Sequence, residues 1–322
     1  MSAAAGAELG AALAPWGLQA AGLSFVAGRE NRVFRVRSTA GDFALRLKRP
    51  GYRSDVELLS ELQWLEAMHR AGLHVPRPVP SQRGRLLESV AGQRVDLLSW
   101  LPGRPLGASR EPLALADPEA VFHRLGRETA RLHDACDAWV RPADFTRCAW
   151  DIDGLLGEAP VWGRFWENPA LDAPTRRLFE DFRAAATHTL LQHAETLDYG
   201  LIHADLVREN VMLDGTTRIG MLDFDDAGFG FRLFDLATTL LKNLAEPSYP
   251  SLKAALLAGY TQVRALDLEL LELFIALRAL TYVGWIVPRI GEGGSEARNR
   301  RFIESARELC RGYPAAPTSA PD

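Results

Sequence analysis

The chain has 322 residues, of which 47% are hydrophobic and 24% charged, so it is long enough for one large domain or for two lobes with a substantial core. A formal net charge of -4 gives no reason to expect nucleic acid as a partner. The three cysteines are odd in number and widely spaced, which predicts neither a disulfide framework nor a zinc site and favours a reducing compartment.

Neither a targeting segment nor a membrane span is predicted. The Ala-rich N-terminus has no basic region and is interrupted by Glu8, unlike a signal peptide. The most apolar late stretch, residues 270–287, contains Glu272 and Arg278 and is expected to be a buried helix. We therefore expect a cytoplasmic protein with no membrane partner. No pattern in the sequence indicates an oligomeric state.

Strands and one strong helix are predicted in the first third of the chain, after a weak amphipathic helix over residues 1–20. Ser54 and Glu57 form a capping box that begins the strong helix, which ends near Gly72. These elements predict a small, sheet-rich N-terminal lobe over residues 1–101. Hydrophobic alternation and turn residues place its strands at residues 23–26, 33–36, 43–47, 85–89 and 94–98.

The rest of the chain, residues 102–322, is predicted to form a larger helical lobe, so the fold class is α+β. Asp117 and Pro118 are typical of an N-cap followed by the first helical residue. Apolar periodicity predicts helices at residues 118–138, 174–197, 234–245, 251–264, 267–287 and 295–311.

Polar side chains capable of chemistry follow an apolar strand in the second lobe. Asp205 and Asn210 lie five residues apart in a loop, and a predicted hairpin comes next, with a two-residue turn at Asp214 and Gly215. Asp223 stands at the end of the returning strand, so we expect it beside Asp205 and Asn210. Two carboxylates and an amide oxygen suit Mg²⁺ bound with a nucleotide phosphate. One carboxylate remains to orient a hydroxyl nucleophile.

This pattern resembles the catalytic core of the aminoglycoside phosphotransferase and choline kinase superfamily, the small-molecule relatives of protein kinases. The family motif is His-Gly/Ala-Asp, four residues, Asn, then a hairpin and Ile/Leu-Asp-x-Asp/Glu. Here it reads His203-Ala204-Asp205, then Asn210, then Leu222-Asp223-Phe224-Asp225. The resemblance implies a bilobal protein-kinase-like fold that uses ATP and Mg²⁺. An alternative interpretation is a polar loop whose Asp residues cap neighbouring backbone groups.

The resemblance also assigns roles to the motif residues. Asp205 would be the catalytic Asp, and Asn210 and Asp223 would bind Mg²⁺. Asp225 is the better candidate for a second metal contact. Asp226 would face the acceptor or cap Gly228. His203 is expected to fix the loop through its backbone, and Asp235 to hold the loop by hydrogen bonds.

In the N-terminal lobe the resemblance implies a nucleotide site. Asn31 would reach a phosphate. Arg46 occupies the place of the strand Lys of kinases, a departure from the kinase pattern, and Glu61 would pair with it. Because Lys48 lies on the same strand face as Arg46, either cation could face the phosphates. The alternative is two solvated charges on a sheet face.

The segment after the last N-terminal strand, Ser99 to Leu101, matches the family's hinge, whose backbone groups bind the adenine edge. It could instead be an ordinary linker with a buried Trp100. Three side chains of the 267–287 helix, Arg278, Tyr282 and Trp285, share one helical face where the family lines its acceptor pocket. They could also be core aromatics and a solvated arginine.

The sequence thus predicts an ATP- and Mg²⁺-dependent phosphotransferase that acts on a hydroxyl of a small amine-bearing molecule. A homoserine- or hydroxylysine-like amino acid, an amino alcohol or an aminoglycoside would qualify. The carboxylate-rich site favours a cationic acceptor. The His-Ala-Asp-Leu form of the loop is similar to that of bacterial homoserine kinases of this superfamily. The alternatives are a Ser/Thr protein kinase and a nucleotide-binding module without turnover.

Overall fold

The computed structural model describes residues 3–28, 31–215 and 218–313 and forms two compact units. Three segments make up unit 1: Met1–Leu106, Ala138–Arg147 and Val211–Asp225. Three others make up unit 2: Gly107–Asp137, Cys148–Asn210 and Asp226–Asp322. The predicted division placed one boundary after residue 101, whereas the chain returns to unit 1 twice. The second return contains the hairpin that follows the catalytic loop, and this hairpin pairs with the end of the N-terminal segment.

Unit 1 is built on a five-stranded antiparallel sheet whose strands confirm all five predicted ones. The order across the sheet is β1 (Gly22–Gly28), β2 (Asn31–Ser38), β3 (Gly41–Lys48), β5 (Gln93–Ser99) and β4 (Leu87–Val90). Ala91 and Gly92 connect β4 to β5 and both have positive φ, 50° and 81°. This is the backbone that a two-residue hairpin with the sheet's own twist requires.

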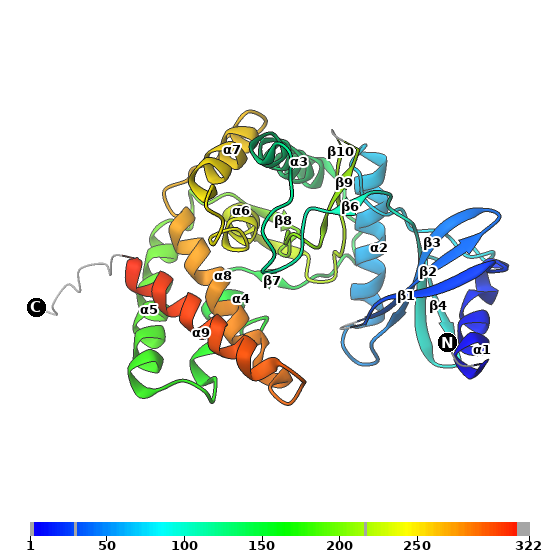
Figure 1. The fold of residues 1–322 in the computed structure, drawn as a ribbon, viewed down its shortest axis with the longest axis horizontal. Coiled ribbons are helices and arrows are strands. Elements are labelled where there is room, and N and C mark those ends of the chain that lie inside the picture. The colour runs from blue at the N-terminus through cyan, green and yellow to red at the C-terminus, as the bar shows by residue number, and fades with distance from the viewer. Residues whose placement is uncertain (1–2, 29–30, 216–217, 314–322) are drawn as a thin grey trace, which may run out of the picture. The chain divides into compact units, whose positions relative to one another are not determined.

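The two faces of this sheet have different chemistry, as the alternation of β3 predicts. Leu45 and Leu47 point to an apolar core shared with α1 (Ala3–Leu13). The other face carries charged side chains toward α2 (Asp55–Arg70), so the sheet lies between the two helices (Figure 1). The predicted capping box of α2 is present, with the Ser54 N–H donating to Glu57 Oε2 at 2.9 Å.

The predicted hairpin after the catalytic loop is also present. β9 (Val211–Asp214) and β10 (Arg218–Met221) pair in antiparallel fashion, with Asp214 opposite Arg218, and β9 also pairs with the short β6 (Arg104–Pro105). The predicted two-residue turn borders residues 216–217, which lie outside the described part of the chain, so its length stays a prediction. The Met221 N–H donates to His74 O at 3.0 Å, which fixes the end of β10 just before Asp223.

Unit 2 is mainly helical, as predicted. Its longer helices are α3 (Pro118–Ala138), α5 (Ala173–Gln192), α6 (Arg232–Leu241), α7 (Tyr249–Thr261), α8 (Leu271–Trp285) and α9 (Ser295–Gly312). α3 and α7 are in close contact, since a Cβ at Gly126 would lie 2.0 Å from Leu256 O. A small sheet adds β7 (Ala149–Trp150), β11 (Gly228–Phe231) and β8 (Tyr199–Ile202), in that order, and the short α4 (Ile152–Leu156) follows β7. The sequence did not predict β7, β11 or α4.

Helix α8 is the buried centre of unit 2, which confirms the prediction for this apolar stretch. All of its residues except Glu272 and Trp285 are buried, and it packs against α6 and α9. By length and composition the stretch Leu271–Arg289 could cross a membrane, but 78% of its most apolar 18-residue window is buried inside the protein. Its apolar composition is therefore accounted for by the core.

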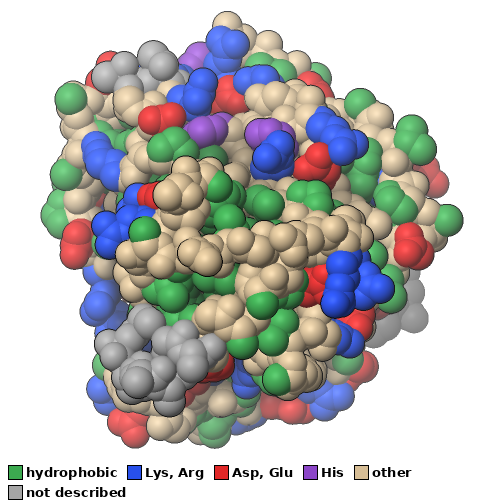
Figure 2. Space-filling model, turned by 90° about the vertical axis from the view of Figure 1, so that its right-hand side faces the viewer, with side chains coloured by type: hydrophobic (Ala, Val, Ile, Leu, Met, Phe, Trp, Pro, Cys, Tyr) green, Lys and Arg blue, Asp and Glu red, His purple; other side chains and the backbone are tan. Residues whose placement is uncertain are grey.

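The surface shows mixed charge. On the face drawn in Figure 2, the Lys and Arg side chains of the described residues are interspersed with Asp and Glu and do not gather into one basic area. Nucleic-acid-binding proteins usually have such a basic stripe or patch. On this face the positive charges are therefore dispersed.

Candidate active site

The catalytic loop is held in unit 2 by one buried carboxylate. Asp235 on α6 accepts the backbone N–H of His203 at 2.8 Å and that of Ala204 at 2.6 Å. His133 Nε2 lies 3.0 Å from the same carboxylate. Burial raises the pKa of Asp235, but the His133 ring and the His203 N–H offset this and hold that pKa below its usual range. The predicted structural roles of His203 and Asp235 are confirmed.

Ala204 adopts a backbone conformation that favours glycine. Its φ is 64° and its side chain is fully buried. An alanine at positive φ costs roughly 1 kcal/mol relative to glycine. A small residue at this place, as in the Gly or Ala of the motif, keeps that strain low in a position without exposed surface.

We expect Ala204→Gly to leave the free energy of unfolding unchanged or to raise it by up to about 1 kcal/mol. The relief of strain opposes the greater chain entropy of the unfolded glycine variant. Ala237→Gly in buried helix α6 is the matched control and should lower stability by about 1 kcal/mol or more. Denaturant unfolding measures both. Equal destabilisation by the two changes would contradict the strained backbone at Ala204.

Asp205 has both carboxylate oxygens in hydrogen bonds with predicted site residues. Asn210 Nδ2 donates to Asp205 Oδ2 at 2.9 Å and to the Asp205 carbonyl at 3.0 Å. Arg278 Nη2 donates to Asp205 Oδ1 at 2.7 Å. Since the Asn210 amide nitrogen faces Asp205, the amide oxygen is the atom left to bind a cation. The predicted base, one predicted metal ligand and the predicted acceptor arginine are thus in contact.

Arg278 is completely buried, which excludes the alternative of a solvated arginine. Nη2 also lies 3.0 Å from the Tyr282 hydroxyl, and the guanidinium carbon is 4.3 Å from the ring centre of Trp162. Nε and Nη1 are buried and have no hydrogen-bond partner among the described residues. Leaving buried guanidinium donors unpaired is costly, so these two donors are suited to bind an acceptor group.

Trp162 is a site residue that the sequence did not predict. Its Nε1 lies 3.3 Å from Asp226 Oδ1, and its ring lies 5.4 Å from Tyr282 and 6.0 Å from Trp285, centre to centre. The four predicted acceptor residues, Asp226, Arg278, Tyr282 and Trp285, therefore converge on this one side chain. Trp162 comes from a segment broken by Pro and Gly, and only its concentration of aromatic residues could have indicated it.

The end of the β9–β10 hairpin carries the remaining predicted carboxylates, in unit 1. Asp223 has φ 65°, a left-handed conformation rarely taken by a non-glycine residue and often found at functional sites. Asp225 is 4% exposed, and its Oδ1 accepts Asn31 Nδ2 at 3.3 Å. Asp225 Oδ2 is buried with no hydrogen-bond partner in the described part of the chain. A buried, unpaired carboxylate oxygen is suited to bind a cation. That Asp223 lies beside Asp205 and Asn210 stays a prediction.

Four buried charges form a cluster between β3, β5 and α2. Arg46 Nη1 lies 2.6 Å from Glu61 Oε1, and Arg46 Nε lies 2.7 Å from Asp96 Oδ1. Lys48 Nζ lies 3.2 Å from both Glu61 Oε2 and Asp96 Oδ2. The predicted pairing of Arg46 with Glu61 is confirmed, and the alternative of two solvated charges is wrong. Asp96, opposite Arg46 on the neighbouring strand, was not predicted.

The charges in this cluster shift the pKa values of Glu61 and Arg46. Burial raises the pKa of Glu61, but the charges of Arg46, Lys48 and Arg147 offset this and bring that pKa well below its usual range. Burial lowers the pKa of Arg46, yet the carboxylates of Asp96 and Glu61 more than compensate and raise it. Glu61 is therefore ionised and Arg46 protonated at neutral pH.

The two predicted hinge residues, Ser99 and Leu101, differ in whether their polar groups already have hydrogen-bond partners. The Ser99 N–H donates to Arg77 O at 2.8 Å and the Ser99 hydroxyl oxygen accepts the Arg77 N–H at 2.8 Å, so both groups are engaged. Leu101 has a buried side chain, and its backbone N–H and carbonyl have no partner within the described ranges. Leu101 is therefore better suited than Ser99 to bind an adenine edge.

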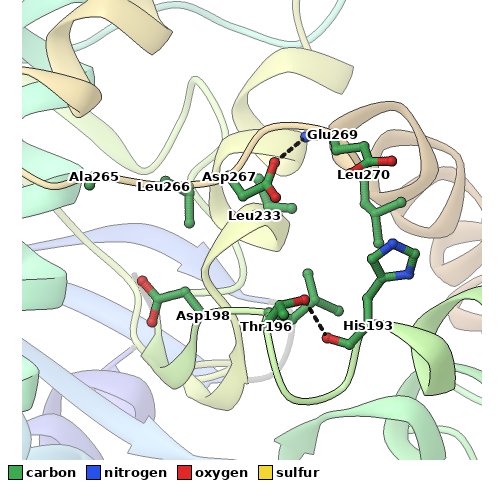
Figure 3. A pocket seen from close by; sticks show the side chains of 10 residues that line it. His193, Thr196, Asp198, Leu233, Ala265, Leu266, Asp267, Glu269 and Leu270 are labelled. Carbon is green, nitrogen blue, oxygen red and sulfur yellow. Dashed lines mark hydrogen bonds between the residues drawn. The ribbon is translucent and has the colours of Figure 1, made fainter.

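Two other features of the described residues do not offer a competing site. Among the described residues no group of three or more His, Cys, Asp and Glu is placed to hold a metal ion. A pocket of about 380 Å³ in unit 2, lined by His193, Asp198 and Asp267 among others, contains none of the predicted site residues (Figure 3). Its Asp267 accepts the Glu269 N–H, and its Asp198 pairs with Arg264, so these carboxylates have structural partners.

Comparison with known proteins identifies the class. The model of the phosphotransferase enzyme family (APH) matches residues 22–272, and the chain belongs to this family. A homoserine kinase of Gluconobacter oxydans (strain 621H) is 32% identical over 254 residues, which cover 74% of this chain and 72% of that protein. Another homoserine kinase, of Chelativorans sp. (strain BNC1), is 31% identical over 293 residues, 88% of this chain and 85% of that protein.

Solved structures agree. A microcompartment-associated aminopropanol kinase superposes with a TM-score of 0.81 at 29% identity, over 95% of this chain and 97% of that one. The predicted α+β, kinase-like fold is confirmed, and the protein is a kinase of the APH family that phosphorylates small-molecule hydroxyl acceptors. The alternatives of a protein kinase and of a nucleotide-binding module without turnover are therefore set aside.

Proposed function

We propose that the protein transfers the γ-phosphoryl group of ATP to the hydroxyl of a small amine-bearing acceptor. Within that class we favour a hydroxy amino acid, similar to homoserine or hydroxylysine, over an aminoglycoside. The observation that carries the preference is Arg278. It is fully buried, touches Asp205 and keeps two nitrogens without a described partner. A planar guanidinium with free donors binds a carboxylate well, and an aminoglycoside has no carboxylate to offer.

In this proposal Asp205 orients the acceptor hydroxyl and takes its proton. In the family's motif, Asn210, Asp223 and Asp225 are the positions that bind Mg²⁺. The free amide oxygen of Asn210 and the unpaired Oδ2 of Asp225 support that assignment. The ion would neutralise charge on the nucleotide phosphates. Phosphoryl transfer depends mainly on such positioning and charge neutralisation.

On the nucleotide side, the backbone of Leu101 would bind the adenine edge, and the charge cluster would support the binding of the phosphates. Arg46 donates three hydrogen bonds to Glu61 and Asp96 and is 6% exposed. It retains N–H groups that could reach a phosphate, and its orientation is fixed by the two carboxylates. Asn31, predicted to reach a phosphate, also donates to Asp225 and would hold that carboxylate in place. The cytoplasm, which supplies ATP and free amino acids, is the proposed location.

ADP release in the presence of Mg-ATP tests the proposal with L-homoserine, 5-hydroxylysine, 3-aminopropan-1-ol and kanamycin as acceptors. We expect turnover with one of the two amino acids and none with kanamycin, and we expect EDTA to stop it. Turnover with kanamycin and with no amino acid would instead identify an antibiotic-modifying enzyme. Turnover that survives complete removal of divalent metal would contradict the Mg²⁺ assignment.

A further inference from the structure

A second cation lies in the acceptor region of unit 2 without an anionic partner. Lys242 follows the last residue of α6, and its Nζ lies 3.8 Å from the ring centre of Tyr282. It makes no ion pair and no hydrogen bond with the residues that the structure describes, and it lies against the rings of Tyr282 and Phe302. Arg278 lies against the same Tyr282 ring, at 4.5 Å.

Two positive charges held against one ring repel each other. Asp205 compensates part of this through a single bond to Arg278, and the Tyr282 ring offers each cation a modest attraction. An anion that contacted both side chains would remove the repulsion and satisfy the buried Arg278 donors. The region is therefore completed by a negatively charged group of the ligand.

The position of Lys242 is fixed relative to the catalytic loop. The next residue, Asn243, accepts Arg208 Nε at 2.9 Å through its amide oxygen, and Arg208 belongs to the loop between Asp205 and Asn210. Asn243 also donates to Thr239 O at 2.7 Å. A residue tied in this way to the loop that carries Asp205 is suited to set where the acceptor hydroxyl lies.

We propose that Lys242 is a specificity-determining residue that binds the acceptor's carboxylate together with Arg278, and that the acceptor is zwitterionic. Its ammonium group would lie on the side of Asp226, whose Oδ1 already accepts Trp162 Nε1. The aromatic faces of Tyr282 and Trp162 carry the protein's own cations. They are therefore not an open cage for a quaternary ammonium group, and the site selects an amino acid over an amino alcohol. This inference rests on the proposed function and adds the residue that enforces the carboxylate.

The test compares L-homoserine with 3-aminopropan-1-ol, which is the same molecule without its carboxylate. Lys242→Met preserves length and the contact with the Tyr282 ring while removing the charge. We expect the kcat/KM for homoserine to fall roughly 10- to 100-fold, mainly through KM, and the kcat/KM for aminopropanol to stay within a factor of two. Lys253→Met, which removes an exposed ion pair with Glu272, is the control and should change neither.

A second readout uses the small number of lysines, which are Lys48, Lys242 and Lys253. An amine-reactive acylating reagent followed by peptide mass spectrometry reports each one. L-2-aminobutyrate, which is homoserine without its hydroxyl, should protect Lys242 and leave Lys253 unprotected. Aminopropanol should protect neither.

The outcomes separate the two proposals. If the wild type turns over aminopropanol better than homoserine, or if Lys242→Met affects both acceptors equally or raises only the KM for ATP, the role of Lys242 is wrong while the phosphotransferase proposal stands. If neither acceptor releases ADP, the acceptor class proposed above fails for these compounds. Protection of Lys242 by L-2-aminobutyrate then tests the carboxylate site without turnover. If L-2-aminobutyrate does not protect Lys242, the proposed carboxylate site is wrong.

Discussion

Asp205→Asn is expected to lower kcat by a factor on the order of 10²–10⁴, the usual contribution of a positioned general base. The amide cannot take the acceptor's proton. Its oxygen can still accept Arg278 Nη2, as Asp205 Oδ1 does at 2.7 Å, so the loop keeps most of its geometry. Binding of Mg-ATP, measured with a fluorescent analogue, should change by no more than a few-fold.

The same variant also removes the only ion-pair partner that Arg278 has in the described structure, and a loss of stability must be separated from a loss of chemistry. Asp137→Asn is a suitable control because Asp137 likewise pairs with a fully buried arginine, Arg232, and neither residue belongs to the catalytic loop. Both variants should unfold at a lower temperature, and only Asp205→Asn should lose turnover below that temperature. Wild-type kcat in Asp205→Asn would show that another group takes the proton.

Contacts in the site were predictable where the residues that make them lie close together in the sequence. The catalytic loop was predictable because Asp205 and Asn210 are five residues apart in one turn-forming segment, and the contact between them follows from that spacing. The hairpin was predictable from its turn residues. Arg278 and Tyr282 lie four apart on one helix, so their contact followed from helical periodicity.

The residues that were missed depend on contacts between distant segments. Asp96 faces Arg46 through the register of two strands fifty residues apart, which no local pattern specifies. Its only signal was a carboxylate among the apolar residues Val95, Leu97 and Leu98 of its strand. Trp162 belongs to an irregular segment without periodicity. β7 and β11 are short, and Gly228 and Gly230 in β11 weaken the strand pattern there.

The buried charge cluster yields the second large effect. Asp96→Asn is expected to lower the free energy of unfolding by about 3–5 kcal/mol, the typical loss when one partner of a buried ion pair is removed. Asp96 is fully buried and accepts Arg46 Nε and Nη2, so its loss leaves Arg46 and Lys48 to share Glu61 alone. Denaturant unfolding followed by circular dichroism measures the change.

Asp55→Asn is the matched control, because Asp55 accepts Arg94 Nε and Nη2 in the same two-bond arrangement on the surface. Water screens that pair, and its loss should change stability little. The pH dependence supplies an independent check, since the pKa of Glu61 is lower in the folded protein than in the unfolded chain. The stability that Glu61 contributes is present above its unfolded pKa and is lost as the pH falls through the folded value. In Asp96→Asn both cations turn to Glu61, so the unfolding free energy should fall at least as steeply on acidification as in the wild type. Equal, small losses in the Asp96 and Asp55 variants would mean that water reaches the cluster and that Arg46 is not held by it.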